Sequence, residues 1–150
     1  MRFRRFEMPS ILCVLAIKST IFLASFHFLG ITTDLYTLWD PWYDKMMHWL
    51  GGSFAAALGM MIVSRRVDIM RSSGKSIFVA SVSFALFVGI LWEISQALTV
   101  VPRFTEKISS ADTILDLFFD VLGGLMVAWQ IQNIKTILLT EKHDRNENKT

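Results

Sequence analysis

Two short polar patterns, 72 residues apart, carry most of the side chains in this sequence that could do chemistry. In the first pattern an acid and an imidazole, Asp44 and His48, lie four residues apart, and Gly51-Gly52 follows. The second pattern has the same spacing and consists of Asp116, Asp120 and Gly123-Gly124. Side chains four residues apart share one face of a helix. Each pattern therefore predicts half of one polar site.

Further acids are expected at the same depth, because Glu93 lies near the end of an apolar run and Asp112 lies four residues before Asp116. Carboxylate oxygens and imidazole nitrogens are ligand types for Mg²⁺, Mn²⁺ and Zn²⁺. The predicted catalytic residues are His48 and Glu93. The predicted metal ligands are Asp44, His48, Glu93, Asp116 and Asp120. Acids in the first turn of a helix also favour its dipole, so simple capping is the alternative for Asp44, Asp112 and Asp116.

Composition sets the class of protein that must hold these residues. The chain has 150 residues, enough for one domain, and 53% of them are hydrophobic. The mean hydropathy of +0.45 is high for a soluble domain of this size. A net charge of +2, with basic residues spread over several short segments, gives no indication of nucleic-acid binding. The sequence therefore predicts a membrane protein whose partners include membrane lipids.

Four apolar runs are long enough to cross about 30 Å of hydrocarbon as helices. The predicted fold is all-α, a polytopic bundle of four transmembrane helices, with a two-hairpin internal repeat as a further option. One domain covers residues 1–140, and residues 141–150 form a charged tail. Both Gly-Gly pairs are expected at helix contacts, because small residues let helices approach closely. The predicted spans are about 11–31, 45–64, 77–98 and 113–134.

Basic residues decide the predicted orientation. Eleven lysines and arginines fall on the side of the two termini and the middle loop, whereas Lys45, Arg103 and Lys107 fall on the other side. Both termini are therefore predicted to be cytoplasmic, in a multi-pass protein. The acids and His48 then lie in the outer half of the membrane, where ionised carboxylates normally face a bundle interior or a water-filled cavity.

The order of polar residues within apolar helices resembles the VanZ-like family of small bacterial membrane proteins. The resemblance covers residues 40–130 approximately and is carried by Asp44-Lys45-x-x-His48-Trp49, Glu93-x-x-Gln96, Pro102-Arg103 and Asp116-x-x-x-Asp120-x-x-Gly123. Two departures are an aspartate at position 120, often asparagine in the family, and a longer link after Arg103. The resemblance implies the bacterial cytoplasmic membrane and, for some members, a link to glycopeptide (teicoplanin) resistance. Arg103 and Gln96 are predicted to bind substrate.

Three hypotheses about function follow from the predicted site. In the first, a divalent cation held by the carboxylates supports an enzyme that acts on a lipid or a lipid-linked phosphate of the cell envelope. In the second, the acids and His48 relay protons or cations in a carrier, although no acid continues a path through the inner half. In the third, the cluster only locks the helices of a binding or assembly protein. The substrate, the metal and the oligomeric state stay open.

Overall fold

The computed structural model describes residues 7–100 and 110–147. All regular secondary structure in these residues is helical, and four of the helices are long and apolar enough to cross a membrane. The predicted all-α class with four spans is therefore confirmed. The helices are α1 (Glu7–Thr32), α2 (Leu35–Leu38), α3 (Trp42–Ser64), α4 (Gly74–Val100) and α5 (Ser110–Glu147).

Each long helix contains one predicted span and extends beyond it. The difference is largest for α5, which runs for 38 residues, whereas its span was predicted to end near residue 134. Residues 141–147 were assigned to a separate charged tail, and the structure continues α5 through them. The physical reason is that α5 has no glycine or proline after Gly124, so nothing in its sequence interrupts the backbone hydrogen bonds when its side chains become polar.

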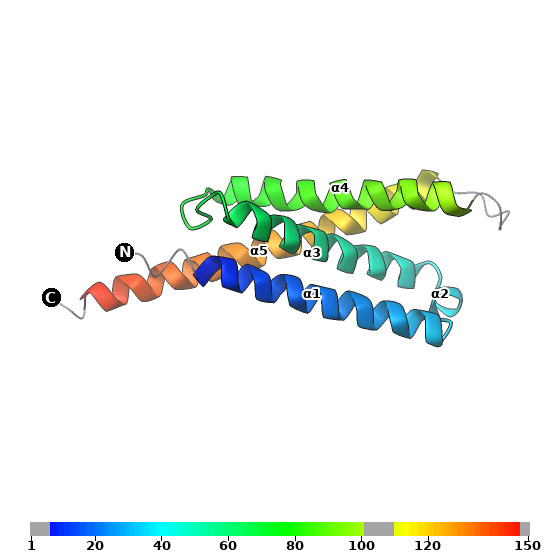
Figure 1. Ribbon diagram of the computed structural model, residues 1–150, viewed down its shortest axis with the longest axis horizontal. Helices are drawn as coiled ribbons and strands as arrows, with labels where there is room; N and C mark the ends of the chain where they lie inside the picture. Colours follow the sequence, from blue (N-terminus) through cyan, green and yellow to red (C-terminus); the bar gives the residue numbers. More distant parts are fainter. Residues whose placement is uncertain (1–6, 101–109, 148–150) are drawn as a thin grey trace.

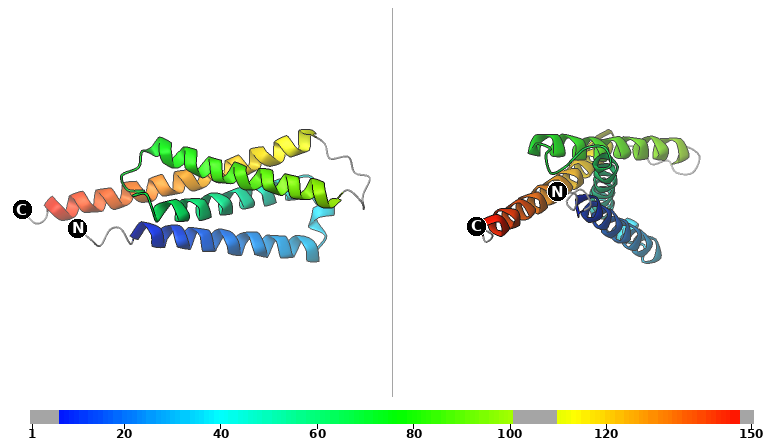
Figure 2. Two further views of the ribbon diagram at one scale, coloured as in Figure 1. Left: turned by 45° about the horizontal axis from the view of Figure 1, so that its top comes forward. Right: turned by 60° about the vertical axis from the view of Figure 1, so that its left-hand side comes forward.

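The long helices alternate in direction, so α3 and α5 run parallel to each other (Figure 1). The start of α1, the α3–α4 connection and the end of α5 lie at one end of the bundle, and α2 lies at the other (Figures 1 and 2). In the most apolar stretch of each helix, 50% of the residues of α3 are buried, compared with 11% of those of α1. Helix α3 is therefore the central helix. Helix α3 contacts α1, α4 and α5.

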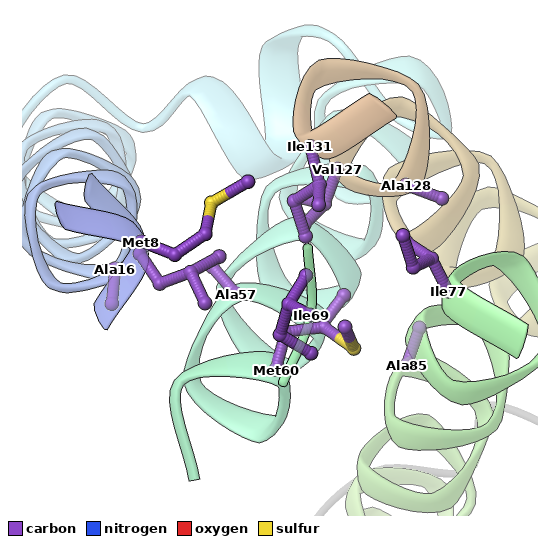
Figure 3. Close-up of a cluster of buried hydrophobic side chains, with 12 residues drawn as sticks. Met8, Ala16, Ala57, Met60, Ile69, Ile77, Ala85, Val127, Ala128 and Ile131 are labelled. Carbon is purple, nitrogen blue, oxygen red and sulfur yellow. The ribbon is translucent and has the colours of Figure 1, made fainter. Parts of the chain in front are cut away.

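The apolar core occupies the half of the bundle away from α2. Its side chains come from the second half of α3, the middle of α5, the first halves of α1 and α4, and the α3–α4 connection (Figure 3). The buried cluster consists of Met8, Leu12, Ala16, Ala56, Ala57, Met60, Ile69, Ile77, Ala85, Val127, Ala128 and Ile131. The acids and the histidine predicted to form the site have the opposite distribution, since they lie early in α3 and α5 and late in α4. The interior of the bundle is thus apolar in the half away from α2 and polar in the half near α2.

A group of aromatic side chains fixes the start of α3 at the polar end. The rings of Tyr36 and Tyr43 meet edge to face with centroids 4.8 Å apart. The Tyr43 hydroxyl donates a hydrogen bond to the carbonyl of Phe26. Both rings press against Gly30, where even one added methyl group would overlap them. These contacts hold the start of α3 against the end of α1 next to Asp44, the first acid of the site.

Candidate functional site

Seven ionisable side chains from three helices meet in the polar half of the bundle, and we call them the polar cluster. They are Asp44, Lys45 and His48 of α3, Glu93 of α4, and Asp112, Asp116 and Asp120 of α5. Five carboxylates thus face one lysine and one histidine. If every acid were ionised, the acids would outnumber the bases by three even with His48 protonated. Ionised carboxylates inside a helix bundle are stabilised by a nearby cation or by sharing a proton.

His48 lies at the centre of the polar cluster with a carboxylate at each ring nitrogen. Its Nδ1 is 3.2 Å from Asp120 Oδ2. Its Nε2 is 3.6 Å from Asp116 Oδ1 and 3.7 Å from Glu93 Oε1. The His48 side chain is only 5% exposed. The position of the ring is therefore fixed from both edges, by residues of two other helices.

The contact between His48 and Asp120 joins equivalent positions of the two sequence patterns, since both residues follow their first acid by four. Because α3 and α5 run parallel, equivalent positions lie at equal depth (Figure 1). The backbone of Asp120 lies against Gly52, and Gly123 lies against the backbone of Trp49 and Ser53, so neither glycine has room for a side chain.

The other two glycines of the pairs have different neighbours. Gly124 faces Ser81 and Ala85 of α4, and a Cβ added to Gly51 would be 3.9 Å from its nearest neighbour, Asp120 Oδ1. A further glycine, Gly89 of α4, lies directly against the Asp120 carboxylate. No pattern in the sequence indicates this contact, because Gly89 stands alone in an apolar helix. Asp120 is thus held where three helices approach closely.

Lys45 supplies a cation to the site that the sequence pattern does not predict. It is 3% exposed, and its Nζ lies 2.5 Å from Asp112 Oδ1, 2.6 Å from Asp116 Oδ1 and 3.3 Å from Asp44 Oδ2. A buried ammonium is stable only when such partners surround it. The signal available in the sequence was its position, three residues before His48 and hence near the same helix face.

Glu93 has an unequal environment at its two oxygens. Oε2 accepts a hydrogen bond of 3.0 Å from the Thr113 hydroxyl of α5. Oε1 is buried and has no hydrogen-bond partner among the residues that the structure describes. A buried oxygen of this kind costs free energy unless a proton, a water molecule or a cation satisfies it. Glu93 therefore presents one oxygen toward His48 that is available for such a partner.

Gln96 and Arg103, predicted to bind substrate, cannot both be placed. Gln96 is half-buried and follows Glu93 by three residues on α4, so it lies near the same face of the helix. Arg103 lies outside the described residues.

A metal ion would find three suitable donors in the polar cluster. Asp44, His48 and Asp116 each offer a ligand atom, and these atoms lie within 4.8 Å of one another. Ligands about 2.1 Å from a shared ion lie roughly 3.0–3.4 Å apart, close to the 3.6 Å between His48 Nε2 and Asp116 Oδ1. A proton on Nδ1 would be donated to Asp120, which is how carboxylates commonly orient metal-binding histidines.

This grouping changes the roles within the predicted metal set. Asp120 lies at the ring nitrogen that faces away from Asp116, so it fits an orienting role better than a ligand role. Lys45 contacts the same Asp116 oxygen that would bind the ion. The donor set therefore fits a divalent cation on the condition that the cation competes with the Lys45 ammonium for Asp116.

A tyrosine next to the cluster stays protonated over a wide pH range. Burial raises the pKa of Tyr36 to about 12, and the nearby Tyr43 and Asp44 act in the same direction. The Tyr36 hydroxyl lies 2.7 Å from Nδ1 of His27, to which it can donate a hydrogen bond. His27 and Tyr36 therefore link α1 to α2, the short helix before the site.

A family described as "Predicted membrane protein (DUF2238)" matches residues 1–136. The chain belongs to this family. The DUF2238 match agrees with the four candidate membrane helices, and it covers every residue of the polar cluster. It supplies no specific support for the VanZ-like resemblance.

A relative from Thermotoga maritima, named "Uncharacterized protein", is 26% identical over 126 residues. The alignment covers 81% of this chain and 62% of the relative, so the chain spans less than two thirds of that protein. No solved structure matches the chain. Membership of the DUF2238 family thus establishes a membrane protein and leaves its reaction to be inferred from the site.

Proposed function

We propose that this protein is an integral membrane enzyme that binds a divalent cation in its polar cluster and acts on a lipid or lipid-linked phosphate of the cell envelope. The observation that carries this proposal is the convergence of Asp44, His48 and Asp116, whose ligand atoms lie within 4.8 Å of one another. The excess of carboxylates over bases supports it, because the cluster needs positive charge that Lys45 alone does not supply.

The exposure of the acids supports a substrate that approaches from the α2 end. The side chains of Asp44 and Asp112 are 34% and 54% exposed, whereas that of Asp116 is 5% exposed. Two tryptophans beside α2, Trp39 and Trp42, are also exposed, and tryptophan gathers at the depth of lipid headgroups. The cluster would thus open toward the depth at which lipid phosphates lie.

Each residue of the proposed site has a definite task. A bound divalent cation would polarise a phosphoryl oxygen. His48 and Glu93 are placed to hold or move a proton, because Glu93 Oε1 accepts no hydrogen bond from the described residues and lies 3.7 Å from His48 Nε2. Asp120 orients His48. We assign substrate binding to Gln96 and Arg103 on the strength of the VanZ-like pattern alone.

The same pattern and the basic residues give the proposed location. We infer a bacterial cytoplasmic membrane with both termini in the cytoplasm, which puts the α2 end and the polar cluster on the outer side. The substrate would then be a phosphate-bearing envelope precursor in the outer leaflet, in keeping with the glycopeptide resistance linked to some VanZ-like proteins.

The metal content of the purified protein tests the proposal. Wild type should hold a divalent cation after dialysis against trace Mn²⁺, and His48→Ala and Asp116→Ala should not. Asp34→Asn is a matched control, because Asp34 lies in the loop at the same end and its left-handed backbone, φ 58°, suits asparagine. Equal metal content in all four proteins, at or near zero, would remove the metalloenzyme assignment.

A second function is supported by one specific contact. Lys45 already provides an ammonium for Asp112 and Asp116 at 2.5 and 2.6 Å, which is what a purely structural cluster in a binding or assembly protein requires. In that case Mn²⁺ should leave the stability of the wild-type protein unchanged at every concentration. In the metalloenzyme, Mn²⁺ should stabilise the folded state in proportion to its binding.

A further inference from the structure

Two open grooves flank the first half of α1, at the end of the bundle opposite the polar cluster. One lies between α1 and α3, has a volume of about 360 Å³ and is lined by Pro9, Ser10, Cys13, Met61 and Arg65. The other extends along α1 beside α5 and is lined by Ser10, Ile11, Val14, Leu15, Lys18 and Ile134. Each groove thus combines mainly apolar walls with one basic side chain.

The basic side chains of the two grooves, Arg65 and Lys18, lie at different depths. Arg65 is the C-cap of α3 and Ser10 lies in the first turn of α1, so both lie at the ends of these helices. Lys18 lies eight residues further along α1, about 12 Å deeper at about 1.5 Å per residue. A lipid phosphate stays near the membrane surface, so it can reach Arg65 and cannot reach the depth of Lys18 without distorting the bilayer.

Charge favours an anionic occupant of the α1–α3 groove. Arg65 is exposed and forms no ion pair with any residue in the described part of the chain. Arg66 and Arg71 follow it in the α3–α4 connection, and Lys75 lies in the first turn of α4. Basic grooves between membrane helices suit phosphate headgroups. The apolar walls at Cys13 and Met61 suit an acyl chain, and about 360 Å³ is within the usual range of roughly 300–1,000 Å³ for small-molecule sites.

We propose that the α1–α3 groove binds an anionic phospholipid from the leaflet at this end of the bundle, with the phosphate at Arg65 and an acyl chain along Cys13 and Met61. The site lies in the other half of the molecule from the polar cluster and does not depend on the function proposed for that cluster. A lipid held there would fill the gap between α1 and the central helix. It would thus stabilise the packing of α1, the least buried of the long helices.

The only cysteine of the chain reports on the groove that it lines. The full-length protein is reconstituted in vesicles of phosphatidylcholine, with or without phosphatidylglycerol, and the rate of Cys13 alkylation by an uncharged, membrane-permeant maleimide is measured. An anionic lipid in the groove should slow alkylation several-fold. Arg65→Gln should lose roughly fivefold in its preference for phosphatidylglycerol, the factor that corresponds to about 1 kcal/mol for one basic residue at the surface. Arg65→Lys should keep most of it.

Two control variants each remove one positive charge and leave the proposed phosphate site at Arg65 unchanged. Lys18→Gln changes the second groove, and Arg71→Gln changes a side chain that is 88% exposed and paired with Asp68. Both should keep the protection of Cys13. Equal alkylation of wild type in the two lipids, or full protection in folded Arg65→Gln, would overturn the proposal.

Two measurements on wild type keep the proposal testable if Arg65→Gln does not fold. Raising the ionic strength should weaken the protection, because salt screens a partly exposed charge. Protection that is independent of salt would overturn the role of Arg65. Inorganic phosphate added to phosphatidylcholine vesicles should give no protection, and protection by phosphate alone would overturn the assignment to a lipid.

Discussion

Replacing Lys45 by methionine removes the only lysine ammonium from the polar cluster and keeps an unbranched apolar stem. Lys45 is 3% exposed, so its stem is packed and methionine should fill most of the same space. The substitution leaves Asp112 and Asp116 without the partner that lies 2.5 and 2.6 Å from them. The expected result is a large loss of folding free energy, arising mainly from one of these pairs.

The exposure of each acid determines which pair dominates. Asp112 is 54% exposed, and an ion pair with such a group contributes about 0–1 kcal/mol. Asp116 is 5% exposed, and removing one partner of a buried pair costs about 3–5 kcal/mol because the other charge stays buried alone. We therefore expect Lys45→Met to destabilise the protein by about 3–4 kcal/mol, nearly all of it through Asp116.

Equilibrium unfolding in mixed micelles, followed by tryptophan fluorescence, measures this loss. The double variant Lys45→Met/Asp116→Leu should recover most of the stability, with a coupling free energy of at least about 2 kcal/mol between the two positions. Lys18→Met is the matched control, because it makes the same chemical change at an exposed lysine and should stay within about 0.5 kcal/mol of wild type.

The same variants distinguish the two candidate functions. If a divalent cation competes with Lys45 for Asp116, Lys45→Met should bind Mn²⁺ more tightly than wild type and regain stability when Mn²⁺ is added. If the cluster is purely structural, Mn²⁺ should not restore the variant. A loss below about 1 kcal/mol in Lys45→Met, or no recovery in the double variant, would show that the Lys45–Asp116 pair does not hold the bundle together.

Three further predictions concern other parts of the molecule. Gly89→Ala should destabilise the protein by about 1–3 kcal/mol in the same unfolding assay, because the added Cβ would overlap the Asp120 carboxylate. Gly51→Ala should be tolerated, because its Cβ would lie 3.9 Å from its nearest neighbour. Equal stability of the two variants would contradict this prediction. The pKa of Tyr36 is higher in the folded protein than in the unfolded chain, so its contribution to stability should be complete below about pH 10 and lost as the pH rises toward 12. In an alkaline titration followed by tyrosinate absorbance, Tyr36→Phe should remove the tyrosine that ionises at the highest pH. A reporter active only in the cytoplasm should be active when fused to the carboxyl terminus, and a silent reporter would contradict the proposed orientation.

The four-helix architecture could be predicted because it depends on local properties of the sequence. Apolar runs of sufficient length report a membrane helix whatever its neighbours are. Helix ends are less accessible from the sequence, because polar residues can continue a helix beyond the membrane. Helix α5 shows this, since it continues through Glu147 without a change in its backbone.

The sequence predicted the level along the helices at which the site lies, but not all of the contacts between its side chains. Equal spacing in the two patterns puts His48 and Asp120 at one level, and the structure places them 3.2 Å apart. Which ring nitrogen faces which acid depends on the rotation of α3 against α4 and α5, and that rotation is set by the packing of the whole bundle. Lys45 could not be assigned to the site from the sequence, because a lysine near a helix start is usually an interfacial residue. Gly89 escaped notice because its role exists only through its contact with another helix.

Pulsed electron paramagnetic resonance of Mn²⁺ bound to the protein tests the central claim most directly, because it detects which nuclei lie next to the metal. If Asp44, His48 and Asp116 hold the cation, the spectrum should contain nitrogen hyperfine coupling from the His48 imidazole. The coupling should vanish in His48→Gln and persist in the control Asp34→Asn. Bound Mn²⁺ without nitrogen coupling, or no bound Mn²⁺ at all, would contradict a metal site in the polar cluster.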